Sequence, residues 1–210
     1  SEGRLALYET AAGKAAKNDD PEAEIRALEG MLEADALPSE GQHRLEELYK
    51  STGQPERVVT LLEKRLEHED DPAALVDGTL QLAELRLEAG GDSSAVVALL
   101  ERALDVDPSN QRALLLLAEL FRAGGFGSQL ADVLRRLVDA LHDDGERVAV
   151  IEELARLSAE ELQDLPGAAG LLEEILRIDP DRQSAALELM RIRERLGEPE
   201  GLLRALNHQL

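Results

Sequence analysis

An apolar motif recurs along this chain every 35 to 37 residues, and this period constrains the possible folds more than any other feature. The clearest copy contains Leu114, Leu117, Ala118 and Phe121, followed by the pair Gly124-Gly125 and a second apolar stripe. Two helices with two short turns take about 35 residues, so a repeat of this length indicates a helix pair. Equivalent positions mark the first helix of each of six pairs: Tyr8, Leu45, Leu82, Leu117, Leu154 and Leu189.

Residues that break helices lie where stacked helix pairs need turns. Gly53-Gln54-Pro55 separates the two halves of one pair, and Pro108 and Pro180 separate successive pairs. Proline fits the first turn of a helix, and glycine fits just beyond its end. Ser39 and Gln42 have the spacing of a capping box at the start of the third helix. We expect helices at 2–17, 21–35, 39–52, 55–69, 72–89, 93–106, 109–123, 127–142, 145–163, 166–178, 181–196 and 199–209, and no strand, since aromatic and β-branched residues are scarce.

The motif resembles the tetratricopeptide repeat (TPR) family. The family signature places a bulky residue, a leucine, a small residue and an aromatic residue on the first helix, and small and bulky residues and a proline on and after the second. Leu117, Ala118 and Phe121 match the first half, and Ala168 and Pro180 match the second. The small residue, such as Ala118, is expected to let the two helices of a pair pack closely.

This resemblance covers residues 39–210 well and residues 1–38 poorly. It implies an all-α fold, a right-handed α-solenoid of about six antiparallel helix pairs, as in the TPR superhelix. We expect one domain over 1–210, with a degenerate first repeat at 1–38 and five clearer repeats at 39–210.

Five residues depart from the family pattern. Arg86, Ser158 and Arg193 stand where the family has an aromatic residue, and Glu46 and Met190 replace the small residue. Several intervals also exceed the usual period of about 34 residues. A divergent TPR array, or a related two-helix solenoid of the same architecture, accounts for these departures.

The composition excludes several classes of function. With 23 Lys and Arg against 44 Asp and Glu, the formal net charge is −21. Such a surface repels phosphates, so nucleic acids and anionic lipids are poor partners, whereas a basic protein would associate faster. Solubility alone also explains the charge. Without cysteine the chain forms no disulfide or Cys-ligated metal site, and no apolar run approaches the roughly 20 residues that span a membrane.

Nothing in the sequence fixes the compartment, although we favour the cytoplasm. The preference for Arg over Lys is typical of a GC-rich bacterial genome.

No residue pattern indicates catalysis, a cofactor or a metal. The four histidines are dispersed along the chain, and none has a Cys or another His at ligand spacing. His68 lies in an acidic run that ends at Asp71, where a solvated helix end is a simpler explanation than a carboxylate–His metal site. Gly124-Gly125-Phe126-Gly127 lacks the Lys and Ser or Thr of a phosphate-binding loop and reads as a turn. We therefore expect that this chain is not an enzyme and assign no catalytic, cofactor-binding or metal-binding residue.

In helical-repeat solenoids the first helices of successive pairs line a concave face, and the family resemblance implies that this face binds a segment of another protein. The candidate peptide-binding residues are Leu80, Glu84, Leu87, Leu115, Glu119, Arg122, Glu152, Arg156, Leu187, Arg191 and Arg195. The same projection places His43 and Asp77 on this face. The leucines are either exposed anchors or packed against a neighbouring helix. The face is more acidic near Asp77 and more basic near Arg191, which suggests a ligand of complementary polarity.

These observations predict a protein–protein interaction scaffold that binds a peptide segment or a flanking domain on its concave face. The alternative is a homotypic assembly domain, since the last expected helix lacks a polar outer stripe. Its apolar residues are Leu202, Leu203, Leu206 and Leu210. The chain starts at Ser1 without Met and stops inside an apolar-patterned helix, so we expect a piece of a longer protein. The partner is then another protein or a segment of the parent chain, of basic character, and homo-oligomers remain an alternative.

Overall fold

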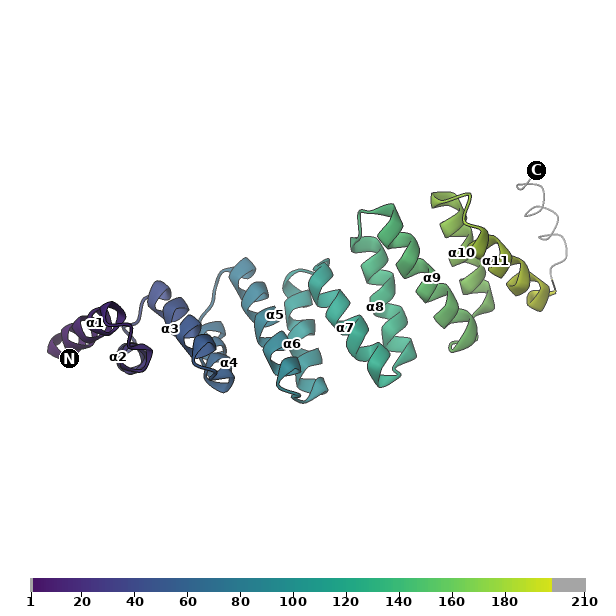
Figure 1. Ribbon diagram of the computed structural model, residues 1–210. Helices are drawn as coiled ribbons and strands as arrows, with labels where there is room; N and C mark the ends of the chain where they lie inside the picture. Colours follow the sequence, from purple (N-terminus) through teal and green to yellow (C-terminus); the bar gives the residue numbers. More distant parts are fainter. Residues whose placement is uncertain (1, 198–210) are drawn as a thin grey trace. The chain divides into compact units, whose positions relative to one another are not determined.

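The structure is a computed structural model, and it describes residues 2–197. This part of the chain forms eleven α-helices and contains no strand, which confirms the all-α prediction (Figure 1). It divides into two compact units, unit 1 at Ser1–Gly91 and unit 2 at Asp92–Leu210. Whether 1–210 forms one continuous domain stays a prediction.

Among the described residues, unit 1 contains five helices and unit 2 six. Those of unit 1 are α1 (Glu2–Lys17), α2 (Pro21–Glu33), α3 (Ser39–Ser51), α4 (Pro55–Leu66) and α5 (Pro72–Glu88). Those of unit 2 are α6 (Ser93–Val106), α7 (Gln111–Gly124), α8 (Gly127–Ala140), α9 (Asp144–Glu160), α10 (Leu165–Ile178) and α11 (Gln183–Leu196). Each described helix lies within three residues of its predicted bounds. The twelfth expected helix at 199–209, with the four leucines proposed for homotypic assembly, lies outside the described residues.

Carboxylate caps explain why many of these helices start where they do. The side chain of Asp20 accepts a hydrogen bond from the Ala23 N–H at 3.0 Å, and Asp71 accepts one from the Ala74 N–H at 3.0 Å. A helix begins with N–H groups that have no partner within the helix, and a capping side chain satisfies one of them. A proline follows each of these two caps at the first helical position, where its missing N–H is no loss.

The first helix of each pair ends in a residue with a left-handed backbone wherever the structure describes its end. Four of these residues are glycines with φ near +70°: Gly53, Gly90, Gly125 and Gly197. Glycine adopts this conformation without a side-chain clash, so the predicted turns are confirmed at these positions. Asp19 after α1 and Gln163 after α9 adopt the same sign of φ without being glycine.

The predicted capping box at the start of α3 is wrong. The helix begins at Ser39 itself, so Pro38 occupies the capping position and no side chain caps the helix. Gln42 instead donates from Nε2 to the carbonyl oxygen of Leu37 at 3.2 Å. The motif has the right spacing but lies one residue too far along the chain to act as a cap.

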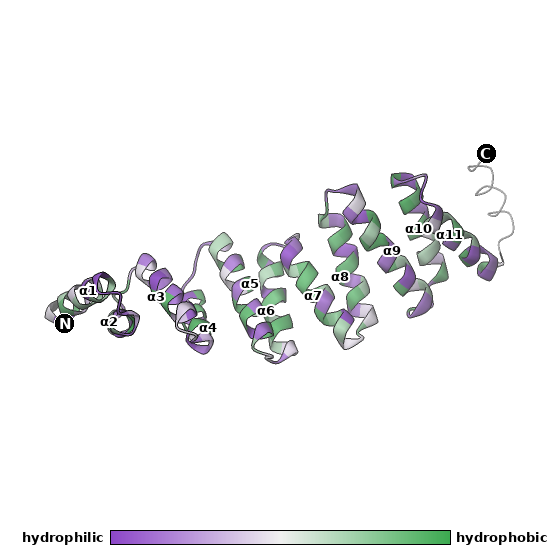
Figure 2. Ribbon diagram, in the orientation of Figure 1, coloured by the Kyte–Doolittle hydropathy of each residue, from purple (hydrophilic) through white to green (hydrophobic). Residues whose placement is uncertain are grey.

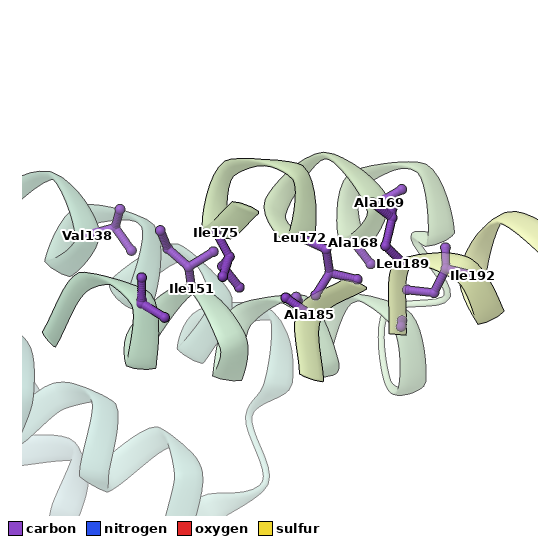
Figure 3. Packing of buried hydrophobic residues seen from close by; sticks show 12 residues of the cluster. Val138, Ile151, Ala168, Ala169, Leu172, Ile175, Ala185, Leu189 and Ile192 are labelled. Carbon is purple, nitrogen blue, oxygen red and sulfur yellow. The ribbon is translucent and has the colours of Figure 1, made fainter. Parts of the chain in front are cut away.

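Within each unit, every helix packs on its neighbours in the sequence, as expected for a helical repeat. The ribbons carry hydrophobic and hydrophilic residues in alternation, as amphipathic helices do (Figure 2). In unit 2, Ile151 of α9, Ile175 of α10 and Ile192 of α11 belong to one buried cluster (Figure 3). The small residues Ala118 and Ala155 are also buried, as the repeat pattern predicts.

Candidate functional site

Unit 1 contains an open cleft of about 980 Å³. It lies among the start of α3, the end of α4 and one face of α5, with the end of α2 at its margin. Its lining combines apolar and charged side chains, among them Leu61, His43, Arg65, His68, Asp77 and Gln81. Clefts of this size are typical of binding sites for ligands and peptide segments.

A glycine on α5 lets the end of α4 lie against that helix beside the cleft. A β-carbon at Gly78 would lie only 2.8 Å from Cδ2 of Leu66, which is closer than real β-carbons approach other atoms. Gly78 therefore allows the side chain of Leu66 to lie directly over α5. Since glycine costs helix stability relative to alanine, its presence inside α5 has a structural reason.

The carboxylate of Glu46 joins three helices below the cleft. It is only 8% exposed, and it accepts hydrogen bonds from Lys50 Nζ at 2.7 Å, from Arg65 Nη1 at 3.3 Å and from the amide of Gln81. Burial on its own raises the pKa of Glu46. The hydrogen bonds from Lys50 and Gln81 and the charges of Lys50 and Arg65 outweigh it and hold this pKa below its ordinary value. Glu46 is therefore ionised near neutral pH.

Four carboxylates line the cleft, and one of them, Glu69, accepts a hydrogen bond from the Asp71 N–H at 3.0 Å. Among the described residues, the side chains of Asp35, Glu67 and Asp77 form no ion pair or hydrogen bond, although all three line the cleft. Of the lysine and arginine side chains in the lining, Arg65 is paired with Glu46, and Lys64 forms no ion pair with any described residue. The cleft therefore has an excess of negative charge that groups within unit 1 do not neutralise.

The predicted residues of unit 1 divide into two groups. His43 and Asp77, which the repeat projection placed on the binding face, line the cleft. Leu80 does not line the cleft, and because it is only 1% exposed, the packed alternative applies to it rather than the exposed anchor. Helix α5 is buried around much of its circumference, so a face that would be open on a typical first helix is covered at Leu80. Glu84 and Leu87 are half-buried and do not line the cleft.

Unit 2 leaves two of the predicted leucines accessible. Leu115 on α7 and Leu187 on α11 are 49% and 55% exposed. The equivalent residue on α9 is Glu152, which accepts two hydrogen bonds from the guanidinium of Arg182 at 2.9 and 2.8 Å and one from Ser184 Oγ at 3.2 Å. The hydrogen bond from Arg182 lowers the pKa of Glu152 despite partial burial. Glu152 therefore holds the start of α11 rather than offering a free carboxylate.

Most of the other predicted charges of unit 2 have partners within the unit. Arg122 donates two hydrogen bonds to Glu153 at 2.8 and 2.9 Å, which raises the pKa of Arg122 and links α7 to α9. The remaining predicted residues are exposed, and two of them pair with an acid on their own helix, Arg156 with Glu160 at 3.9 Å and Arg191 with Glu188 at 3.2 Å. Glu119 and Arg195 complete the exposed set. The basic character expected for this face is thus largely balanced by neighbouring carboxylates.

The repeat pattern does not indicate the part of the cleft that the second helix α4 contributes. His43 and His68 are 25 positions apart, and only the packing of α3 on α4 brings them to one cleft. The signals present in the sequence were Glu46 in place of a small residue and Gly78 inside a helix. Each marks an unusual contact, but neither specifies the partner.

The described residues contain neither a cluster of metal-binding side chains nor a membrane-spanning helix. No group of three or more His, Asp or Glu side chains in residues 2–197 is arranged to hold a metal ion. No described helix is both long and apolar enough to cross a membrane.

Comparison with known proteins identifies the fold. No family model matches the sequence, and no curated protein matches it. Among solved structures, the crystal structure of the MamA protein is 14% identical with a TM-score of 0.50, over 88% of this chain and 96% of that one. A putative kinesin light chain from Podosopora anserina with nearly identical TPR-like repeats is 22% identical (TM-score 0.47; 80% and 92% covered). YrrB, a TPR protein with an unusual peptide-binding site, is 14% identical (TM-score 0.49; 85% and 88% covered).

The class of the protein is therefore defined by its fold. The chain has an all-α helical-repeat fold similar to that of the MamA structure. This confirms the family resemblance seen in the repeat motif at the level of the fold.

Proposed function

We propose that this chain is a protein–protein interaction scaffold that holds a segment of another protein, or of its own parent chain, against the first helices of its repeats. The observation that carries the proposal is the open cleft of about 980 Å³ in unit 1. Residues of two first helices, α3 and α5, line it together with the end of α4. Of the residues that the repeat projection placed on the binding face, His43 and Asp77 line this cleft, whereas Leu80, Glu84 and Leu87 do not.

The groups at the cleft are better suited to recognition than to catalysis. Glu46, the most buried carboxylate near it, is held ionised by Lys50 and Arg65 and already accepts three hydrogen bonds. A general acid would need the opposite environment, in which burial raises its pKa towards neutrality. The exposed charges and half-buried apolar side chains of the lining instead resemble the surface of an interface.

The net charge of −21 favours a partner with positive charge. Opposite charges accelerate the encounter between two proteins, and the acceleration decreases as salt screens the charges. A basic partner segment is therefore part of the proposal.

Affinity purification with a variant that fills the cleft tests the proposal. Ala74 lines the cleft and is half-buried, so Ala74→Trp places a large ring where a partner segment would lie. Ala6→Trp adds the same ring at an exposed position of α1 and serves as the matched control. We expect a partner that copurifies with the parent protein and with the Ala6 variant and is lost with the Ala74 variant, while both variants keep the helical dichroism of the wild type. An identical set of copurified proteins for both variants would contradict a role for the cleft.

A further inference from the structure

We propose that the cleft of unit 1 recognises lysine or arginine side chains of an extended protein segment. This inference rests on the proposed scaffold function and names the chemistry of the partner. It combines the shape of the cleft, the charges at its margin and the contrast with the carboxylates elsewhere in unit 1.

The lining of the cleft fits a side chain that is apolar along its stem and charged at its tip. Leu32, Leu61 and Ala74 supply apolar surface, and Asp35, Asp77 and other polar residues lie beside them. Lysine and arginine pack their methylene groups on apolar surface while the charged group stays at the polar margin. A purely apolar side chain would leave the carboxylates without a partner, and an acidic one would meet like charge.

The charges of the lining favour a cation from more than one direction. Asp35 follows α2, Glu67 follows α4 and Asp77 lies on α5, so the negative charges come from separate elements. Arg65 does not cancel them, because its guanidinium lies 3.3 Å from the buried carboxylate of Glu46. Lys64 is the remaining cation of the lining, and one lysine does not balance three carboxylates.

The carboxylates where the helices of unit 1 meet are used differently. Glu24 on α2 accepts two hydrogen bonds from Arg44 on α3, at 2.8 and 3.0 Å. Glu29 on α2 accepts from Tyr49 and from Arg57, each at 2.6 Å. Unit 1 therefore pairs the carboxylates that lie between its helices, whereas Asp35, Glu67 and Asp77 at the cleft, like other exposed carboxylates of the unit such as Glu56, have no partner among the described residues. In the proposed complex, a cationic side chain of the partner pairs with these carboxylates of the cleft.

Selection from a displayed library of random peptides against the whole chain tests this inference. We expect the enriched peptides to carry Lys or Arg and to bind less tightly as salt is raised. The variant Asp35→Asn/Asp77→Asn should weaken their binding about 3- to 10-fold, since each exposed charge pair contributes modestly. The control Glu9→Gln/Glu88→Gln changes the net charge equally at two exposed positions outside the cleft and should have little effect.

Reversing the charge of Lys64 should have the opposite effect on the affinity for basic peptides. Lys64→Glu removes the one unpaired cation of the lining and should strengthen the binding of basic peptides about 2- to 5-fold. Basic peptides that bind the cleft and control variants equally, or enriched peptides that are acidic or neutral, would overturn the inference and leave the scaffold function standing. Failure of any peptide to be enriched would count against both.

Discussion

The two units share one repeat architecture but differ in what holds their helices together. Among the described residues, the buried charged ones are Glu24 and Glu46 of unit 1, and each is paired with a cation on another helix. The ion pairs of unit 2 lie nearer its surface, and most of the largest fully buried side chains lie in this unit: Leu100, Leu114, Leu117, Leu134, Leu137, Ile151, Leu154, Ile175 and Ile192. The difference teaches that a helical repeat tolerates polar contacts between its helices when every buried charge has a partner.

One position of the repeat shows how an ion pair can replace an aromatic contact between helix pairs. Where the family has an aromatic residue at the end of the first helix, Arg86 in unit 1 and Arg193 in unit 2 form ion pairs with Glu63 and Glu173. Each glutamate lies on the second helix of the preceding pair. At the equivalent position of α3, Tyr49 donates a hydrogen bond to Glu29 on α2, so the charged side chains make a contact back to the preceding pair in the same direction. The repeat conserves the direction of this contact while its chemistry changes.

The largest expected effect is a cavity in the apolar core of unit 2. Ile151 is fully buried between α9 and its neighbours, so Ile151→Ala should lower the free energy of unfolding by about 2–5 kcal/mol. Hydrogen exchange of peptides from unit 2, measured by mass spectrometry, reports the loss of protection. As the control, Leu115→Ala truncates a half-exposed leucine of the same unit and should change stability by at most about 0.5 kcal/mol. Equal effects of the two substitutions would refute an apolar core as the basis of unit 2.

The next largest effect is expected at the buried ion pair of unit 1, which should stabilise this unit as the apolar core stabilises unit 2. Glu46→Ala restores the small residue of the family pattern but leaves Arg65, only 20% exposed, without its carboxylate. We expect a loss of about 1–3 kcal/mol, because a half-buried charge without a partner is costly. Both tyrosines, Tyr8 and Tyr49, lie in unit 1 and the chain has no Trp, so tyrosine fluorescence during urea unfolding follows this unit.

A second substitution separates loss of the pair from loss of packing. The double variant Glu46→Ala/Arg65→Met removes both charges and should recover much of the stability that the single variant loses. If Glu46→Ala is neutral or stabilising, the network around Glu46 does not support unit 1, and the contrast between the units fails.

The sequence predicted the elements of both units well, because their signals are local. The bounds of α6 agree with the expectation at both ends, since Asp92 caps the helix just before the apolar stripe begins. Helix length, glycine turns and the buried small residues all follow from spacing within a single pair. These features need no knowledge of how one pair packs on the next.

The cleft could not be predicted, because it depends on contacts between pairs. Arg65 and Gln81 are 19 and 35 positions away from Glu46, and the repeat period does not indicate that they meet there. Likewise, Leu80 was placed on an open face because the period gives each first helix the same exposed side, whereas α5 is buried more broadly. Periodicity specifies the direction of a side chain relative to its own helix, and the neighbouring helix decides whether that direction is open.

The stability that the charge of Glu46 gives to unit 1 should depend on pH, and the uncharged variant Glu46→Gln provides the comparison. The pKa of Glu46 is lower in the folded chain than its ordinary value of 4.5, so folding is favoured by its ionised form. Its contribution is fully present above about pH 4.5 and is lost as pH falls through the lower folded pKa. The stability difference between the wild type and Glu46→Gln should therefore be largest above about pH 4.5 and shrink towards pH 3. A difference that stays constant over this range would show that the charge of Glu46 does not stabilise unit 1.

The smallest expected effect concerns an ion pair in the more exposed setting of unit 2. Arg122 and Glu153 have side chains that are 48% and 24% exposed, against 20% and 11% for Arg65 and Glu46 in unit 1. A double-mutant cycle over Arg122→Ala and Glu153→Ala should give a coupling energy of about 0.2–1 kcal/mol that decreases with salt, because water and ions screen the pair. The same cycle over Arg65 and Glu46 should give a larger coupling that salt changes less. Equal coupling energies in the two cycles would mean that burial does not distinguish the ion pairs of the two units.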